Sequence, residues 1–353
     1  MPEKPSPALV AAIGAAGLLA AAFRRGGPDL TPVPLRPGRR SRAGVGREAA
    51  TPAEIPARGW WQVLKRTVQQ ASEDRLLTEA AGVTFFTLLA LFPAIAALVS
   101  LYGLFADPAT IWRHFSILEG LVPGGGMDVL KDQVQRIAEK GPGTLGFSLA
   151  LSLATSLWSA NQAIKALFDA LNVVFEEKET RGFLRLTAET LGFTFASLVF
   201  VLLAIAAVVA LPVALAVVGI GAEADLLLRL ARWPLLLLTM TVFLACVYRF
   251  GPNRRQAKWR WVTWGGAMAS VLWVAVSGAF SFYVAQFGNY NATYGSLGAV
   301  IGFMTWIWLS SAVMLVGAEL DAELEHQTAR DTTVPGDRPM GARGARMADT
   351  VAS

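Results

Sequence analysis

The chain has 353 residues, of which 54% are hydrophobic and only 16% are charged, and its mean hydropathy is +0.46. This fraction of charged residues is too small to form the polar surface of a soluble domain of this size. The composition therefore indicates a membrane protein. The single cysteine excludes an intramolecular disulfide, and the net charge of +5 must be explained either by topology or by a polyanionic partner.

The N-terminal region begins with an apolar run, Ala8–Phe23, which Arg24 and Arg25 follow directly. A secretory signal carries its positive charge before the apolar stretch, so residues 1–25 are expected to form either an extra short span or a helix on the membrane surface. Residues 26–58 are rich in proline and arginine and are predicted to be a disordered cytoplasmic linker.

The segment 60–79 has the pattern of an amphipathic helix. Trp60, Leu64 and Val68 recur every four residues, and the charged side chains of the segment lie mostly at other positions. Such a helix lies at a membrane surface with its tryptophans at the level of the lipid headgroups, so we expect it at the cytoplasmic interface.

Six long apolar runs follow, and each reaches or approaches the roughly 20 residues that cross a bilayer. They are Ala80–Phe105, Thr144–Ala160, Leu191–Gly219, Trp233–Phe250, Trp261–Phe287 and Gly295–Leu320. The sequence therefore predicts an all-α, polytopic transmembrane bundle of six spans over residues 59–325, with residues 326–353 as a disordered cytoplasmic tail.

The positive charges alternate between the connecting segments. Segments 24–79, 161–190, 249–260 and 321–353 together hold 24 lysines and arginines, whereas the other three connections hold 6. Cytoplasmic loops retain positive charge, so this split predicts a multi-pass inner-membrane protein with a cytoplasmic C-terminus. Topology thus accounts for the basic composition, and no nucleic-acid partner is expected.

The outer connection 106–143 contains apolar residues at helical spacing after the break Pro123–Gly126. Two interpretations stay open for it: a helical cap over the outer mouth of the bundle, or a helix packed on the neighbouring spans.

Several blocks of sequence resemble the BrkB/YihY family of bacterial inner-membrane proteins. They are Ala80–Phe86 with Leu91–Pro93, Leu157–Ala160 with Ala170–Asn172, Tyr248–Pro252, and Tyr294–Ile301 with Gly317–Leu320. The resemblance covers about residues 60–325 and implies six helices with both ends cytoplasmic. Members of this family have been called virulence-associated proteins, transporters and, historically, ribonuclease BN.

The ribonuclease interpretation is disfavoured by the residues themselves. Phosphodiester cleavage needs an acid–base pair or metal ions beside a basic groove, yet the two histidines fall on opposite sides of the predicted membrane. No metal cluster, P-loop or nucleophile elbow is present in the sequence, so we expect no metal, no cofactor and no enzymatic activity.

Four residues are candidates for a cavity or functional site: Pro93, Asn161, Asn172 and Glu319. Polar side chains at membrane depth usually face a cavity or a partner, and a proline inside a span kinks the helix. The simpler alternatives are that Asn172 caps a helix and that Glu319 lies in cytoplasmic water. Small residues on one face of the last run predict close helix packing instead, at Gly295, Gly298 and Gly302.

The sequence favours a transporter, or a transport-assisting protein, for a lipid or other amphiphile of the cell envelope, with membrane lipids as its partners. The rival interpretation is a membrane scaffold or assembly factor that transports nothing. Neither the substrate, the energy source nor the oligomeric state follows from the sequence.

Overall fold

The computed structural model describes residues 44–352, except for 104–141, 206–221, 288–295 and 337. Among these residues the chain is helical, with no β-strand beyond an isolated bridge between Ala257 and Thr333. The elements are η1 (Pro52–Glu54), α2 (Ala57–Glu73), α3 (Leu76–Gly103), α6 (Pro142–Val174), α7 (Phe183–Ile205), α9 (Ala222–Phe250), α10 (Trp259–Phe287), α12 (Ser296–Gln327) and α13 (Arg346–Asp349). The all-α prediction is confirmed for this part of the chain.

Each of the six predicted apolar runs overlaps one long helix, from α3 to α12. In the part of the chain that the structure describes, three helices are long and apolar enough to cross a membrane: Phe183–Phe200, Trp259–Val284 and Val300–Gln327. Two shorter apolar helices are Leu76–Ala90 and Leu236–Phe250. The six-span arrangement therefore remains a prediction. The apolar N-terminal run Ala8–Phe23 and the outer connection 106–143 lie outside the described residues, apart from the first residues of α6.

Large apolar side chains are exposed along these helices. Phe195 on α7, Leu238 on α9 and Phe282 on α10 are each more than 60% exposed. A soluble protein rarely leaves so much apolar surface in water, whereas a bilayer solvates such side chains. The helices thus have the surface of a membrane domain.

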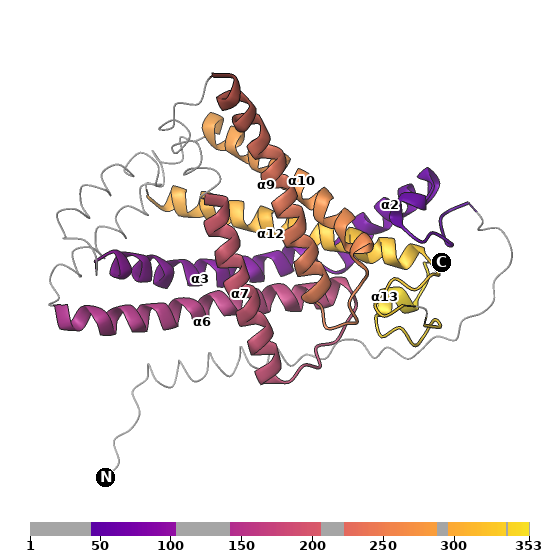
Figure 1. The fold of residues 1–353 in the computed structure, drawn as a ribbon, viewed down its shortest axis with the longest axis horizontal. Helices are drawn as coiled ribbons and strands as arrows, with labels where there is room; N and C mark the ends of the chain where they lie inside the picture. Colours follow the sequence, from indigo (N-terminus) through magenta and orange to yellow (C-terminus); the bar gives the residue numbers. More distant parts are fainter. Residues whose placement is uncertain (1–43, 104–141, 206–221, 288–295, 337, 353) are drawn as a thin grey trace, which may run out of the picture. The chain divides into compact units, whose positions relative to one another are not determined.

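Helix α12 is the element around which the others pack. It contacts α2, α3, α6 and α10, and the Tyr248 hydroxyl of α9 donates a hydrogen bond to the carbonyl oxygen of Met314 at 2.6 Å. Helices α3 and α6 run side by side along their length (Figure 1). The core of this region gathers Leu76, Leu171, Leu315 and neighbouring apolar side chains, all buried.

Glycines allow α10 and α12 to approach closely. The amide of Gly265 donates to Oδ1 of Asp321 at 2.7 Å, and a Cβ on Gly265 would lie 2.1 Å from the carbonyl oxygen of Gly317. A Cβ on Gly302, by contrast, would meet no described atom within 4 Å. The observed close contact therefore lies at Gly265 and Gly317. No described atom contacts Gly302 in the way predicted, while Gly295 and the surroundings of Gly298 lie outside the described residues, so their packing role stays a prediction.

The C-terminal tail differs from its prediction. Residues 326–353 were expected to be disordered, but within this segment Thr328, Thr332 and Met347 are buried. The amide of Ala329 donates to the carbonyl oxygen of Arg47 at 2.8 Å, so the tail packs against residues 44–58 of the predicted linker. Both segments are ordered because their polar groups are satisfied by hydrogen bonds to each other, which compensates for their small apolar content.

Helix α2 is amphipathic as predicted, but its faces are distributed differently. Trp61 and Val68 are more than 70% exposed, whereas Trp60 packs its ring 5.4 Å from that of Trp264. Arg66 pairs with Glu323 of α12 and so ties α2 to the end of the bundle.

Candidate functional site

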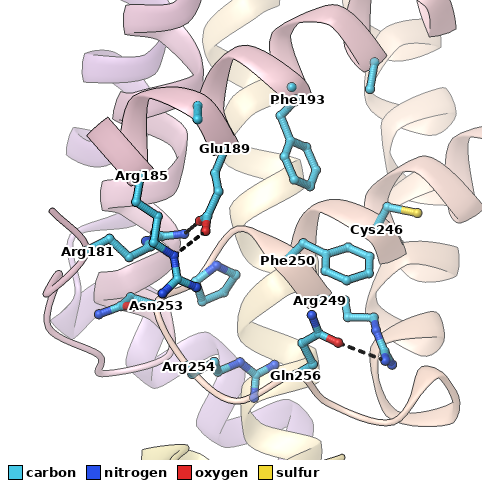
Figure 2. Close-up of a pocket in the computed structure, with 14 residues that line it drawn as sticks. Arg181, Arg185, Glu189, Phe193, Cys246, Arg249, Phe250, Asn253, Arg254 and Gln256 are labelled. Atoms are coloured by element: carbon cyan, nitrogen blue, oxygen red, sulfur yellow. Dashed lines mark hydrogen bonds and ion pairs between the residues drawn. The ribbon is translucent and has the colours of Figure 1, made fainter. Parts of the chain in front are cut away.

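A pocket of about 550 Å³ lies between α7, the end of α9 and the loop 251–256 (Figure 2). Helix α7 begins at Phe183 after an irregular linker, and its residues 185–196 turn one face toward the pocket at helical spacing. The last turn of α9 contributes the opposite wall. Phe200 of α7 stacks on Phe243 of α9 at 4.5 Å, so the two helices touch beside the pocket.

The pocket has an excess of positive charge, although Glu179, Glu189 and Glu325 pair with three of its arginines. Four arginines and one glutamate line it: Arg181, Arg185, Arg249, Arg254 and Glu189. Because three of these arginines are largely buried, their charges are screened less by water than surface charges would be. The pocket therefore favours an anion.

Arg181 is held rigidly beside the pocket. Its guanidinium pairs with Glu179 at 2.6 Å and with Glu189 at 2.8 Å, and it donates to the carbonyl oxygen of Gly251 at 3.0 Å. Desolvation raises the pKa of Glu179, but hydrogen bonds from Arg181 and Asn172 outweigh it and hold that pKa below its ordinary value. Both partners thus remain charged at neutral pH, and the linker 175–182 is fastened to the end of α9.

Arg254 has donors to spare. Its Nη1 lies 2.9 Å from both carboxylate oxygens of Glu325, and its guanidinium stacks 3.9 Å from the centre of the Phe175 ring. Its Nε and Nη2 are buried with no hydrogen-bond partner among the described residues. An unsatisfied buried donor costs about 1–3 kcal/mol.

Arg249 shows the same feature on the other side of the pocket. It donates to the carbonyl oxygen of Ala257 and stacks over the Trp259 ring at 4.6 Å, while its Nε lacks a partner within the described chain. Figure 2 shows Arg249 next to Gln256, across the pocket from Arg181 and Glu189.

The remaining wall of the pocket is apolar. Phe193 and Phe250 lie with ring centres 6.5 Å apart, and Ala196 and Cys246 extend the surface along α7 and α9. Both helices belong to the apolar runs predicted to cross the membrane. The pocket thus joins a cationic end to an apolar wall, which suits an amphiphile with an anionic headgroup.

The sequence candidates lie elsewhere, and none of the four is among the residues that line this pocket. Asn161 is buried on α6 with no hydrogen-bond partner for its Oδ1 among the described residues. Glu319 is fully buried on α12, and neither carboxyl oxygen has such a partner. It does not lie in cytoplasmic water, as the simpler alternative held. Pro93 lies within α3, and its surroundings are outside the described residues.

Asn172 makes hydrogen bonds through both ends of its amide. Its Oδ1 accepts from the amide of Asn253 at 2.7 Å, and its Nδ2 donates to Glu179 at 3.1 Å. These bonds join the end of α6 to the loop after α9 and to the linker before α7. The geometry indicates that Asn172 has a structural role and holds the loop 251–256, which lines the pocket, in place.

The pocket arginines were counted in the sequence only as topology charges. One signal could have singled out Arg249: it lies in the last turn of an apolar run, where a charge is costly unless a partner or cavity receives it. The described residues contain no group of three or more histidines, cysteines or acidic residues that could hold a metal ion.

Comparison with known proteins agrees with the resemblance seen in the sequence. The family described as Virulence factor BrkB matches residues 67–340. The chain is 29% identical over 256 residues to the putative ribonuclease-like protein YfkH of Bacillus subtilis, covering 70% of this chain and 89% of that protein. It is 30% identical over 260 residues to a UPF0761 membrane protein of Chlorobium luteolum, covering 72% of this chain and 58% of that protein.

A third relative, the UPF0761 membrane protein VP0125 of Vibrio parahaemolyticus, is 25% identical over 74% of this chain and 82% of its own length. The chain thus spans most of some relatives but only about three fifths of others, such as those of Chlorobium and Nitrosospira. No solved structure matches the chain.

Proposed function

The chain belongs to the BrkB family of membrane proteins, and on that premise we propose that it transports, or helps to transport, an anionic lipid or similar amphiphile of the cell envelope. It is not an enzyme in this proposal, and the ribonuclease-like name of one relative is not carried over to it. The protein lies in the bacterial inner membrane with its C-terminus in the cytoplasm, as the distribution of lysine and arginine predicts.

The observation that carries the proposal is the pocket between α7 and α9, where buried arginines meet an apolar wall. A phosphate or carboxylate headgroup accepts charge-assisted hydrogen bonds from guanidinium groups, which are about twice as strong as neutral ones. The acyl chain of the same molecule would lie along Phe193, Ala196 and Cys246, which are part of helices with lipid-facing surfaces.

The charge count predicts that this pocket lies at the cytoplasmic end of the bundle. All four arginines lie in segments that the charge count assigns to the cytoplasm. Anionic headgroups of the inner leaflet would therefore be at the right depth to enter the pocket laterally. A scaffold protein has no need for a basic cavity of this size, so the pocket favours transport over the scaffold alternative.

The single cysteine offers a direct binding test without a new probe site. Cys246 lines the pocket and is the chain's only cysteine. We expect maleimide labelling of Cys246 in detergent micelles to slow when phosphatidylglycerol is added, and to slow much less with phosphatidylcholine, because only the anionic headgroup engages the arginines.

The matched control moves the thiol to an exposed position away from the pocket, in a Cys246→Ser, Thr263→Cys variant. Labelling at residue 263 should not distinguish the two lipids. Equal protection at both positions, or no protection at Cys246, would remove the support for a lipid site between α7 and α9.

A further inference from the structure

A second basic recess, of about 630 Å³, lies where the C-terminal tail meets the start of α10. Four of its lining residues are cations: Lys258, Arg260, Arg330 and Arg338. Lys258 lies just before α10 and Arg260 in its first turn, whereas the other two come from the tail, so about 70 residues of sequence separate the two halves. The fold brings these charges together, and nothing in the local sequence does so.

The nearby acidic groups do not neutralise the four cations. The carboxylate of Asp331, which also lines the recess, accepts hydrogen bonds from the amides of Thr333 and Arg338 at 2.9 Å and from the Thr333 hydroxyl at 2.8 Å. Glu54, whose charge acts on Arg260 and Arg330, accepts from the amide of Ala50 at 2.7 Å. Among the described residues, the carboxylate of Asp331 in the lining and that of Glu54 nearby thus face four cations.

Three of the guanidinium groups have no binding partner. Arg260, Arg330 and Arg338 are exposed, and their side chains make no hydrogen bond or ion pair with other residues that the structure describes. Lys258 Nζ donates to the carbonyl oxygen of Asp331 at 2.7 Å. Repulsion between like charges around one recess is unfavourable, so an anion bound there would relieve it.

The backbone around the recess is fixed in advance. Arg343 is buried, and its guanidinium donates to the carbonyl oxygens of Ala329 at 2.7 Å, Ala348 at 2.6 Å and Arg338 at 3.2 Å. The amide of Lys258 donates to the carbonyl oxygen of Thr332 at 2.7 Å, which attaches the tail to the start of α10. A ligand would meet its cations already assembled, so binding it would require little ordering of the chain.

We propose that this recess binds a ligand with clustered phosphate groups. Arginine is suited to phosphate because its planar donors match two phosphate oxygens at once, and four cations exceed what a single phosphate needs. A volume of about 630 Å³ lies within the range of small-molecule sites. The ligand is either a soluble polyphosphorylated molecule or a headgroup with more than one phosphate. The site is separate from the α7–α9 pocket and does not depend on lipid binding there.

The test measures binding to the purified full chain in dodecyl maltoside at an ionic strength of about 0.15 M, where surface charges are screened beyond about 8 Å. Inorganic tripolyphosphate serves as the soluble probe. Mixed micelles containing cardiolipin, which carries two phosphate groups, serve as the lipid probe. The test variant is Arg330→Gln, Arg338→Gln, and the control is Arg58→Gln, Lys65→Gln, which removes the same charge from exposed positions on α2.

We expect the test variant to weaken binding of at least one probe by about tenfold or more, which is about 1.4 kcal/mol, while the control stays near wild type. Weakened tripolyphosphate binding identifies a soluble ligand, and weakened cardiolipin binding alone identifies a headgroup. The melting temperature of both variants should match wild type, because neither pair of side chains makes a hydrogen bond or ion pair with the residues that the structure describes.

Two outcomes would overturn the proposal. One is equal weakening in both double variants, which would show only a general charge effect. The other is failure of wild-type protein to bind either probe. If the test variant is less stable than wild type, Arg260→Gln alone decides between these outcomes, because its side chain is exposed and makes no hydrogen bond or ion pair with the described residues.

Discussion

Replacing Gly265 with alanine should lower the free energy of unfolding of the bundle more than adding a methyl group at any other glycine of α10. A Cβ at this position would lie 2.1 Å from the carbonyl oxygen of Gly317 and 2.5 Å from Cγ of Asp321. The first obstacle is the backbone of α12, and the second is a carboxylate already bonded to the Gly265 amide at 2.7 Å. Neither can move without breaking the contact between the two helices.

The expected cost of Gly265→Ala is about 3 kcal/mol or more, at the upper end of what overpacking causes. The control is Gly302→Ala on α12, where a Cβ meets no described atom within 4 Å. There the only change is helix propensity, which favours alanine by up to about 1 kcal/mol. The free energy of unfolding should be measured for both variants in mixed dodecyl maltoside and dodecyl sulfate by far-ultraviolet circular dichroism.

A loss of stability in Gly302→Ala equal to that in Gly265→Ala would refute the reasoning. It would mean that the predicted packing face at Gly298 and Gly302 is occupied after all, by a second copy of the chain or by residues outside the described part.

Three other outcomes are expected. Asn172→Leu should lower the free energy of unfolding by about 1–3 kcal/mol, since the partners of its amide are left unsatisfied. Asn161→Leu removes an oxygen without a partner among the described residues and should leave the melting temperature near wild type. The reverse ranking of the two variants would contradict the structural role assigned to Asn172. Burial, together with nearby carboxylates, raises the pKa of Asp74 from 3.8 to about 6, so the folded chain binds this proton more tightly. Stability should therefore decline as pH rises from about 4 through about 6, and Asp74→Asn should flatten that part of the pH profile; an unchanged profile would count against the shift. Reporter fusions after Glu177 should give a cytoplasmic signal and fusions after Gly141 an outer one, and a cytoplasmic signal at both would overturn the predicted topology.

The helices were predictable because apolar composition alone specifies them in a membrane chain. Each of the six runs overlaps a long helix, and the amphipathic pattern of 60–79 predicted α2 as far as Glu73, whereas residues 76–79 belong to α3. Two of the predicted runs end earlier than the helices do, since α6 continues to Val174 and α12 to Gln327. These extensions carry charged residues, whose partners come from other segments, so hydropathy could not mark them as helical.

The ordered tail could not be predicted for a related reason. Its burial depends on hydrogen bonds such as that from the Thr328 hydroxyl to the carbonyl oxygen of Ala49, across about 280 residues. No local periodicity records such a contact. The structural role of Asn172 escaped in the same way, because its partner Asn253 lies 81 residues away.

The pocket between α7 and α9 could not be predicted from the sequence, because the membrane topology already explained its arginines. Positive charge in cytoplasmic loops needs no further cause, so Arg181, Arg249 and Arg254 carried no separate signal. Only the tertiary structure shows that they are buried and turned toward one cavity.

Lipid movement across a reconstituted bilayer tests the central claim most directly. The full chain would be placed in phosphatidylcholine vesicles that contain a trace of fluorescent phosphatidylglycerol, and loss of signal to an external quencher would be followed over time. The account predicts faster exchange than in protein-free vesicles, slower exchange for Arg185→Gln and Arg249→Gln, and an unchanged rate for the control Arg58→Gln, Lys65→Gln. Exchange no faster than in protein-free vesicles, or equal exchange by wild type and both pocket variants, would contradict transport through this pocket and favour the scaffold interpretation.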